Sequence, residues 1–282
     1  MQTVLSIAGF DPSSGAGVTA DLAVFAAHGL FGTSCITALT AQSTRGVRST
    51  HPVSSQIVAD TLACLDADLP PAGIKIGMPG NADNIHIICD YLDIYNLSHS
   101  IIIRELPLVV LDPILESSSG RELLDTEGVK AMRKRLLPLV DWVTPNLAEL
   151  ALLSGEPVVV REDVPRASQA LQAQVAGARH GRSLGVLATG GHLEPPDDFL
   201  LDRDGEGLWL PGERVVTQAT HGTGCALSSA FLSRLVLGDM PREAALAAKR
   251  YVAGALRTAV KRGSGNGPMN HLWMFSKALD QL

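Results

Sequence analysis

Short apolar runs alternate with longer helical patterns along almost the whole chain, and this alternation limits the possible fold most strongly. Residues 4–9 form an apolar run typical of a strand buried on both faces, and a helical pattern follows at 18–28. The order recurs, which predicts parallel strands joined by right-handed crossovers, with helices on both faces of the sheet. Further strands are expected at 34–40, 74–78, 108–111, 142–144 and 184–188, and further helices at 54–69, 81–95, 126–137, from 145, and at 164–178.

The alternation changes near the C-terminal third of the chain. Residues 199–201 and 208–210 flank the turn 202–207 and predict a β-hairpin, and two final helices follow the loop at 220–225. No linker, internal repeat or charge run marks a second domain. We therefore expect a single doubly wound α/β domain over residues 1–282, long enough to bury a sizeable core.

Composition excludes several classes of protein. A hydrophobic content of 46% with 18% charged residues describes a soluble globular chain. The net charge of -6 and the lack of a Lys/Arg block argue against nucleic acid as a partner. No apolar run reaches the roughly 20 residues that span a bilayer, and no basic region opens a signal peptide. The four cysteines are scattered, which argues against disulfides or a zinc site and favours a reducing cytoplasm.

Polar and glycine-rich segments follow most of the predicted strands. In doubly wound sheets ligands bind beyond the carboxyl ends of the strands. We therefore expect a cleft along one edge of the sheet, where these segments meet: residues 9–17, Gln42, residues 77–78, Asp112, Asn146 and residues 190–191.

The segment 220–225, Thr-His-Gly-Thr-Gly-Cys, combines small residues with the start of a helical pattern. Free N–H groups at a helix N-terminus form a site for an anion such as phosphate, and the helix dipole there favours a thiolate at Cys225. The alternative is a glycine-capped loop with a small buried cysteine. This segment alone does not decide between the two.

Several polar residues at the predicted edge have a structural and a functional interpretation. Asn146 and Glu149 have the spacing of a capping box, which is favoured by spacing alone, although Glu149 also suits hydrated Mg²⁺. Asp112 is equally well a metal or phosphate ligand or a loop cap. A carboxylate such as Asp21, one turn into a helix, usually complements the helix dipole.

Side chains of other types at this edge are harder to assign. Gln42 carries an amide that both donates and accepts, which suits the edge of a heteroaromatic ring, but such a residue more often completes a loop. His192 and His221 lie on glycine loops, fit solvated surface histidines, and are not assigned to a metal.

Nine segments together resemble the hydroxymethylpyrimidine and phosphomethylpyrimidine kinases of thiamine biosynthesis, members of the ribokinase-like superfamily. They include Asp11-Pro12-Ser13-Ser14-Gly15 and His221-Gly222-Thr223-Gly224-Cys225, and they cover nearly the whole chain in order. The matching stretches are 6–17, 20–22, 36–47, 75–78, 109–113, 144–149, 190–192, 221–225 and 267–271.

The resemblance implies a three-layer sandwich and the ATP-dependent phosphorylation of an aminopyrimidine alcohol and then of its monophosphate. Cys225 would be the general base, and the N–H groups of Gly222, Thr223, Gly224 and Cys225 would form an anion hole. The further roles implied are a pyrimidine site at Gly9, Asp21, Gln42 and Met78, nucleotide contacts at Asp112, Asn146, Thr189 and Gly191, and Mg²⁺ near Glu149. The family often pairs subunits, which makes a homodimer an expectation.

The chain departs from the family pattern at two cations. Thr189 and Ser118 stand where lysines are common in the family, and a few extra residues precede Leu108, at 98–107. Loss of such charges slows phosphoryl transfer, because each stabilises the moving group. Two alternatives therefore stay open beside the active kinase: a pyridoxal-type kinase, and a non-catalytic pyrimidine-binding protein.

Overall fold

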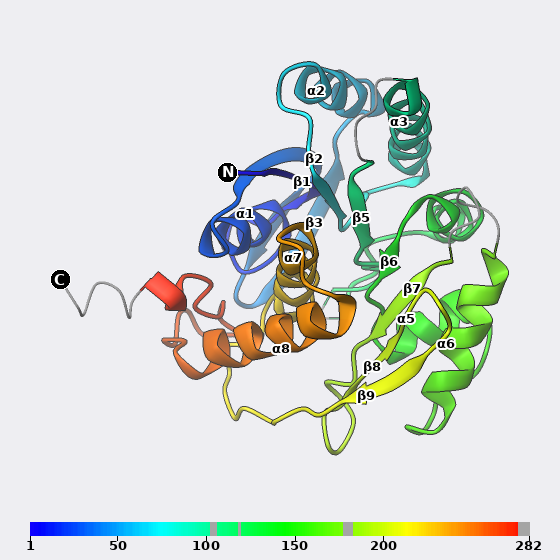
Figure 1. Ribbon diagram of the computed structural model, residues 1–282. Helices are drawn as coiled ribbons and strands as arrows, with labels where there is room; N and C mark the ends of the chain where they lie inside the picture. The colour runs from blue at the N-terminus through cyan, green and yellow to red at the C-terminus, as the bar shows by residue number, and fades with distance from the viewer. Residues whose placement is uncertain (102–105, 118–119, 177–182, 276–282) are drawn as a thin grey trace.

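Nine strands form one sheet in the part of the chain that the computed structural model describes, which is residues 1–101, 106–117, 120–176 and 183–275 (Figure 1). Their order across the sheet is β3-β2-β1-β4-β5-β6-β7-β8-β9. The strands are β1 (Thr3–Phe10), β2 (Phe31–Ser43), β3 (Gly46–Pro52), β4 (Gly73–Ile76), β5 (Leu108–Leu111), β6 (Trp142–Val143), β7 (Gly185–Ala188), β8 (Asp198–Leu201) and β9 (Gly207–Leu210).

The strands from β2 to β7 pair in parallel, which confirms the mostly parallel, doubly wound sheet expected from the alternation. The predicted hairpin is also present, because β8 and β9 pair antiparallel at one edge. At the other edge the prediction was wrong. The second strand was expected at 34–40 and none was expected after it, but β2 continues to Ser43 and pairs antiparallel with β3. An edge strand without buried residues lacks the apolar run that marks the central strands.

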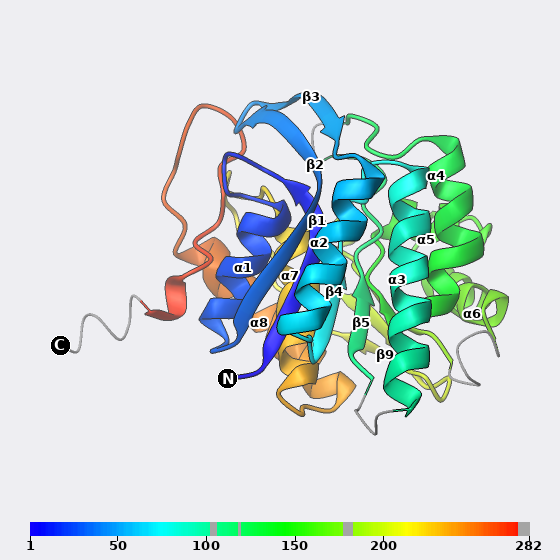
Figure 2. The ribbon, with the colours of Figure 1, turned by 90° about the horizontal axis from the view of Figure 1, so that it is seen from above.

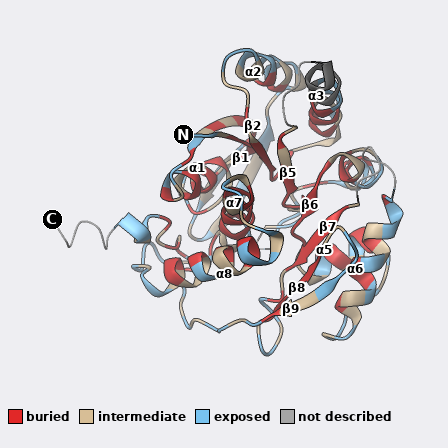
Figure 3. Cartoon of the chain, viewed as in Figure 1, coloured by how far each residue is buried: buried red, intermediate tan, exposed pale blue. Residues whose placement is uncertain are grey.

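Helices cover both faces of the sheet (Figure 2). One face carries α1, α7 and α8, and the other carries α2 to α6, each with its own buried apolar cluster. Figure 3 shows burial concentrated on the central strands and on α7. The helices are α1 (Gly17–Ala27), α2 (Ser55–Asp68), α3 (Ala82–Ile101), α4 (Thr126–Ala131), α5 (Leu147–Ser154), α6 (Asp163–Gln174), α7 (Thr223–Val236) and α8 (Pro241–Arg257).

Three helical boundaries differ from the sequence-based expectation. The helix expected at 126–137 is α4 followed by a π turn at Met132–Leu136 and a 3-10 turn at Leu137–Leu139. Helix α3 runs beyond the expected residue 95 to Ile101, which takes up part of the extra segment, and 102–105 lie outside the described residues. Helix α6 ends at Gln174 instead of 178. None of the helices in the described residues is long and apolar enough to cross a membrane.

Trp142 anchors the layer between the sheet and α7. Its side chain is 1% exposed, and its ring meets Phe231 of α7 edge-on, with the ring centroids 5.2 Å apart. On the neighbouring strand, a Cβ at Gly185 would lie 2.2 Å from the Trp142 ring, so the absence of a side chain there makes room for the indole. This packing holds the middle of α7 against the sheet.

Truncation of the Trp142 side chain should therefore lower the stability of the fold. We expect Trp142→Ala to lower the free energy of unfolding by about 3–5 kcal/mol, because the substitution leaves a cavity under α7. Val216 is 96% exposed, and Val216→Ala should change the same quantity by less than about 0.5 kcal/mol. Urea denaturation of the two variants and the parent measures both values, and a loss below about 1 kcal/mol for Trp142→Ala would contradict the assignment.

Candidate active site

A cavity of about 1900 Å³ lies along the carboxyl ends of the parallel strands. The segments that follow six neighbouring strands all contribute to its wall, so the cleft expected from the sequence is present. These contributions are Gly9 near the end of β1, Gln42 near the end of β2, Met78 after β4, Asp112 after β5, Asn146 after β6, and Thr189 with Gly191 after β7.

The first turn of α7 closes this cavity on the side of the helix layer. Gly222 is the N-cap, with φ of 81°, and a Cβ there would lie 1.8 Å from the carbonyl oxygen of Gly15, so only glycine fits. The cap has no side-chain hydrogen bond, and the cavity is lined by Gly222, Thr223, Gly224 and Cys225. The N–H groups of this turn are therefore available to an anion in the cavity.

Cys225 lies on that first turn, with 6% of its surface exposed. Burial raises the pKa of its thiol to about 12, against the opposing effects of the Lys75 charge and of a hydrogen bond from the Gly17 N–H. The expectation of a lowered pKa at this helix N-terminus is therefore wrong. Burial, the largest cause, disfavours the thiolate because it removes the charge from water.

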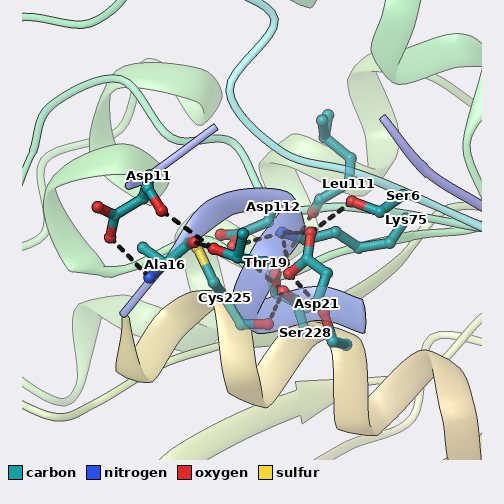
Figure 4. A network of polar contacts seen from close by, with 12 residues as sticks. Ser6, Asp11, Ala16, Thr19, Asp21, Lys75, Leu111, Asp112, Cys225 and Ser228 are labelled. Carbon is teal, nitrogen blue, oxygen red and sulfur yellow. Dashed lines mark hydrogen bonds and ion pairs between the residues drawn. The ribbon is translucent and has the colours of Figure 1, made fainter. Parts of the chain in front are cut away.

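A buried ion pair lies directly behind Cys225 (Figure 4). Lys75 Nζ is 3.0 Å from both carboxylate oxygens of Asp21, and the two side chains are fully buried. Ser6 and Ser229 donate hydrogen bonds to the same carboxylate at 2.6 and 2.8 Å. Burial lowers the pKa of Lys75, but the charges of Asp21, Cys225 and Asp112 and the hydrogen bond to Asp21 together outweigh it, so the pKa is raised and the ammonium stays charged.

Asp112 extends this cluster to the cavity wall. Its carboxylate is 3.7 Å from Lys75 Nζ and accepts a hydrogen bond from Ser228 Oγ at 3.1 Å. Burial raises the pKa of Asp112, while the charge of Lys75 and hydrogen bonds from Ser228 and Cys225 act in the opposite direction. Asp112 therefore lies beside the Cys225 thiol, and its carboxylate accepts a proton more readily than an exposed aspartate does.

The structural and functional interpretations of Glu149 both have support. Glu149 Oε2 accepts from the Asn146 N–H at 2.8 Å, and Asn146 Oδ1 accepts from the Glu149 N–H at 3.0 Å, which is the predicted capping box. Glu149 also lines the cavity. Its pKa is raised to about 8, first by burial and then by the charge of Asp112.

Basic side chains from the far side of the cavity surround the glycine loop after β7. Lys249 of α8 pairs with Asp198 at 2.6 Å, and Asp198 accepts from the Gly190 N–H at 2.8 Å. Arg214 donates to the carbonyl oxygens of Leu193 and Gly191 at 2.7 and 3.4 Å. The cations on the cavity wall are Lys249, Arg214, Arg250 and Arg257.

A second polar cluster lies at the opposite end of the cavity, near Gln42. Asp11 accepts hydrogen bonds from the N–H groups of Ser13, Gly15 and Ala16 at 2.8 to 3.2 Å, which shapes the loop after β1. His221 lies 2.7 Å from Asp11 and 3.0 Å from Gln42. Burial raises the pKa of Asp11, but hydrogen bonds from His221 and Ser13 outweigh it and the pKa is lowered.

Comparison with known proteins then gives the family. A family model described as phosphomethylpyrimidine kinase matches residues 11–270. The chain belongs to this family. It is 36% identical to the hydroxymethylpyrimidine/phosphomethylpyrimidine kinase of Haemophilus influenzae, over 98% of each chain, and 37% identical to that of Escherichia coli, over 95% of this chain and 96% of the other.

Solved structures agree with the family assignment. The phosphomethylpyrimidine kinase of Clostridium difficile superposes with a TM-score of 0.74 at 32% identity, covering 90% of this chain and 98% of that one. A Bacillus subtilis pyridoxal kinase, in an ADP complex, superposes with a TM-score of 0.82 at 26% identity, covering 98% and 99%. The expected ribokinase-like fold and the kinase class of enzyme are confirmed.

In this member of the phosphomethylpyrimidine kinase family, most of the predicted site residues line the cavity. Asp21 is an exception. It was expected in the pyrimidine site, yet it is fully buried and lies behind the wall, bound to Lys75. Ser118 lies outside the described residues. Sequence reasoning also left Lys75 without a role and treated His221 as a surface residue, although His221 is 9% exposed.

The buried ion pair gives a prediction for stability. Lys75→Met should lower the free energy of unfolding by about 3–5 kcal/mol, because it leaves Asp21 charged and uncompensated. Adding Asp21→Asn removes that charge, so the double variant should recover most of the loss. Chemical denaturation of the parent, both single variants and the double variant gives the coupling between the sites, and strictly additive losses would argue against a direct pair.

The raised pKa of Cys225 gives a prediction for chemical reactivity. Among the cysteines, Cys64 is exposed, whereas Cys35, Cys89 and Cys225 are buried with a pKa raised to about 12 by burial. Iodoacetamide near neutral pH should therefore modify Cys64 first. Because the thiolate reacts, modification of Cys225 should accelerate about tenfold per pH unit as the pH rises. Peptide mass spectrometry, with Cys64→Ser as control, measures this, and rapid labelling of Cys225 near neutral pH would contradict it.

Proposed function

We propose that this protein phosphorylates 4-amino-5-hydroxymethyl-2-methylpyrimidine and then its monophosphate, with ATP as donor, in thiamine biosynthesis. The observation that carries the proposal is the arrangement of one cavity. The N-terminus of α7, which has no side-chain cap, and Cys225 line the same cavity as Gln42 and Met78. The names of the relatives from Haemophilus influenzae and Escherichia coli support this substrate.

In this proposal the first turn of α7 stabilises the transferring phosphoryl group. The N–H groups of Gly222, Thr223, Gly224 and Cys225 donate to its oxygens as charge develops on them. These donors are preorganised, since the αL conformation of Gly222 and its contact with Gly15 hold the turn in place before any ligand arrives. Gly9, Gln42 and Met78 hold the ring so that its hydroxyl faces this turn.

Cys225 takes the hydroxyl proton as the general base in this mechanism. Because the free thiol is protonated, its own proton must move first, and Asp112 is the neighbouring acceptor with a raised pKa. The sulfur then receives the proton of the attacking hydroxyl, while the carboxyl group of Asp112 holds the thiol proton. The Lys75 charge behind both groups stabilises the anionic stages.

The nucleotide occupies the other half of the cavity. Asp112, Asn146, Thr189 and Gly191 border that half and are the proposed nucleotide contacts. Thr189 brings no positive charge, so the proposal assigns the missing charge to the basic side chains on the far wall, chiefly Lys249 and Arg214.

Mg²⁺ fits the oxygen ligands beside the proposed nucleotide site. Glu149 lines the cavity, and its buried carboxylate favours a hydrated cation beside the phosphates, because a cation there would offset the burial that raises its pKa. Asp112 keeps its role as the proton acceptor of Cys225 and is not assigned to the metal. Mg²⁺ would neutralise phosphate charge, and Glu149 would hold its waters.

A pyridoxal-type kinase is the second candidate function. The likeness to the Bacillus subtilis pyridoxal kinase favours it, and a Staphylococcus aureus pyridoxal kinase in complex with AMP-PCP and pyridoxal also superposes, with a TM-score of 0.80. A non-catalytic pyrimidine-binding protein is the remaining alternative. A homodimer and a cytoplasmic location, which the free cysteines fit, stay part of the proposal.

ATP-dependent turnover tests the proposed function. With ATP and Mg²⁺, the purified protein should convert the aminopyrimidine alcohol to its monophosphate and then its diphosphate, with a higher kcat/KM than for pyridoxal. Cys225→Ala should reduce kcat by about 100-fold or more while the alcohol still binds, because only the proton acceptor is lost. Coupled ADP release and calorimetric binding measure these quantities. Tight binding without turnover would favour the non-catalytic protein, and a near-normal rate for Cys225→Ala would remove its base role.

A further inference from the structure

A row of four polar side chains crosses the ring-binding end of the cavity. It begins at Asp11 after β1, passes through His221 before α7, and ends at Gln42 and Thr40 of β2. His221 Nε2 is 2.7 Å from Asp11 Oδ2 and 3.0 Å from the amide atom placed as Gln42 Nε2. The other amide atom, placed as Gln42 Oε1, is 3.2 Å from Thr40 Oγ1. The partners of the amide require these two atoms to be exchanged.

Asp11 settles which nitrogen of His221 carries a hydrogen. A carboxylate only accepts, so at 2.7 Å the Nε2 atom must donate, whether the imidazole ring is neutral or charged. Asp11 is 3% exposed and is also held by N–H groups of its own loop, so it is fixed in place. His221 Nε2 therefore has no lone pair with which to accept from Gln42, and its one hydrogen, donated to Asp11, can only be shared with Gln42.

The direction of the Gln42 amide follows from its two neighbours. The oxygen and nitrogen of an amide have the same shape, so their partners decide which is which. A hydrogen on His221 Nε2 requires the amide oxygen on that side. The amide nitrogen then faces Thr40, whose hydroxyl can donate its one hydrogen to the carbonyl oxygen of Phe10, at 3.0 Å, and accept from Gln42. With this direction no two donors face each other, and the hydrogen on His221 Nε2 is shared between Asp11 Oδ2 and the Gln42 oxygen.

We propose that His221, held by Asp11, is a positioning residue that determines which edge of a heteroaromatic ring the cavity accepts. Gln42 then offers an acceptor on the His221 side and a donor on the Thr40 side, in a fixed order. The matching ring edge is an exocyclic amine next to a ring nitrogen, as in a 4-aminopyrimidine. This inference rests on the proposed function and specifies how its substrate is oriented.

The same order also directs the reacting group. In the proposed alcohol, the 4-amine lies between the ring nitrogen N3 and the carbon that carries the hydroxymethyl group. With the amine on the His221 side, the hydroxymethyl group lies further in that direction, where Gly222 to Cys225 follow His221 in the chain. A reversed amide would turn the ring over and point the hydroxymethyl group toward Thr40. One hydrogen on His221 thus links recognition of the ring to placement of the hydroxyl.

The test compares two alcohols that differ only at this edge. The 4-oxo analogue carries a carbonyl and an N3–H, so its donor and acceptor are reversed. The parent protein should prefer the 4-amino alcohol by about 100-fold or more in kcat/KM, because a site built for one hydrogen-bond order rejects the other. His221→Phe keeps a ring against Gly15 but has no N–H, so Gln42 can turn over and the preference should fall by about tenfold or more.

Two further variants keep the test decisive. His221→Leu should reduce the preference in the same way if His221→Phe folds poorly, as judged by thermal unfolding. His221→Gln retains N–H groups for both Asp11 and Gln42, and should keep the preference within about threefold of the parent value. Equal losses on both alcohols in His221→Phe and His221→Leu, with the preference unchanged, would overturn this inference while the proposed function stands. Failure of the parent to phosphorylate either alcohol would overturn the proposed function, and this inference with it.

Discussion

The buried ion pair between Lys75 and Asp21 is the interaction on which the site depends. It joins β4 to α1, and Ser6 of β1 and Ser229 of α7 complete the hydrogen bonds of the Asp21 carboxylate. Four elements from two layers are thereby held at one point directly behind the cavity wall. Because a charged pair without its partners would be very unfavourable in this interior, the pair specifies one arrangement of β1, β4, α1 and α7. Because Ser229 lies on α7, this arrangement also positions the first turn of that helix.

The same pair affects the electrostatics of the cavity wall that carries Cys225. The Lys75 charge is the largest influence that lowers the pKa values of Cys225 and Asp112, but burial exceeds it at both groups and raises both pKa values. The resting protein therefore carries a protonated thiol beside a carboxylate, rather than a free thiolate. In the proposed mechanism, preorganised N–H donors at the first turn of α7 supply the larger part of the stabilisation.

Much of the fold was predictable because its central strands are buried on both faces and give continuous apolar runs. The edge strand β3 was missed since its residues are mostly polar and half-exposed. The cavity position followed from the rule that ligands bind at the carboxyl ends of parallel strands. The partners of single side chains did not follow: Asp21 and Lys75 meet across 54 residues, and Asp11 and His221 across 210. Local sequence patterns do not predict pairs so far apart in the chain. The pKa of Cys225 was also not predictable from its place at a helix N-terminus, because burial raises that pKa.

The central claim is that one cavity places a pyrimidine hydroxyl against the first turn of α7. A crystal structure of the protein with the aminopyrimidine alcohol and a non-hydrolysable ATP analogue tests it most directly. The account predicts the hydroxyl oxygen within hydrogen-bonding distance of Cys225 Sγ, the 4-amine at the His221 side of Gln42, and the terminal phosphate at the N–H groups from Gly222 onward. A ring bound outside this cavity, or turned so that its hydroxyl faces Thr40, would contradict the account.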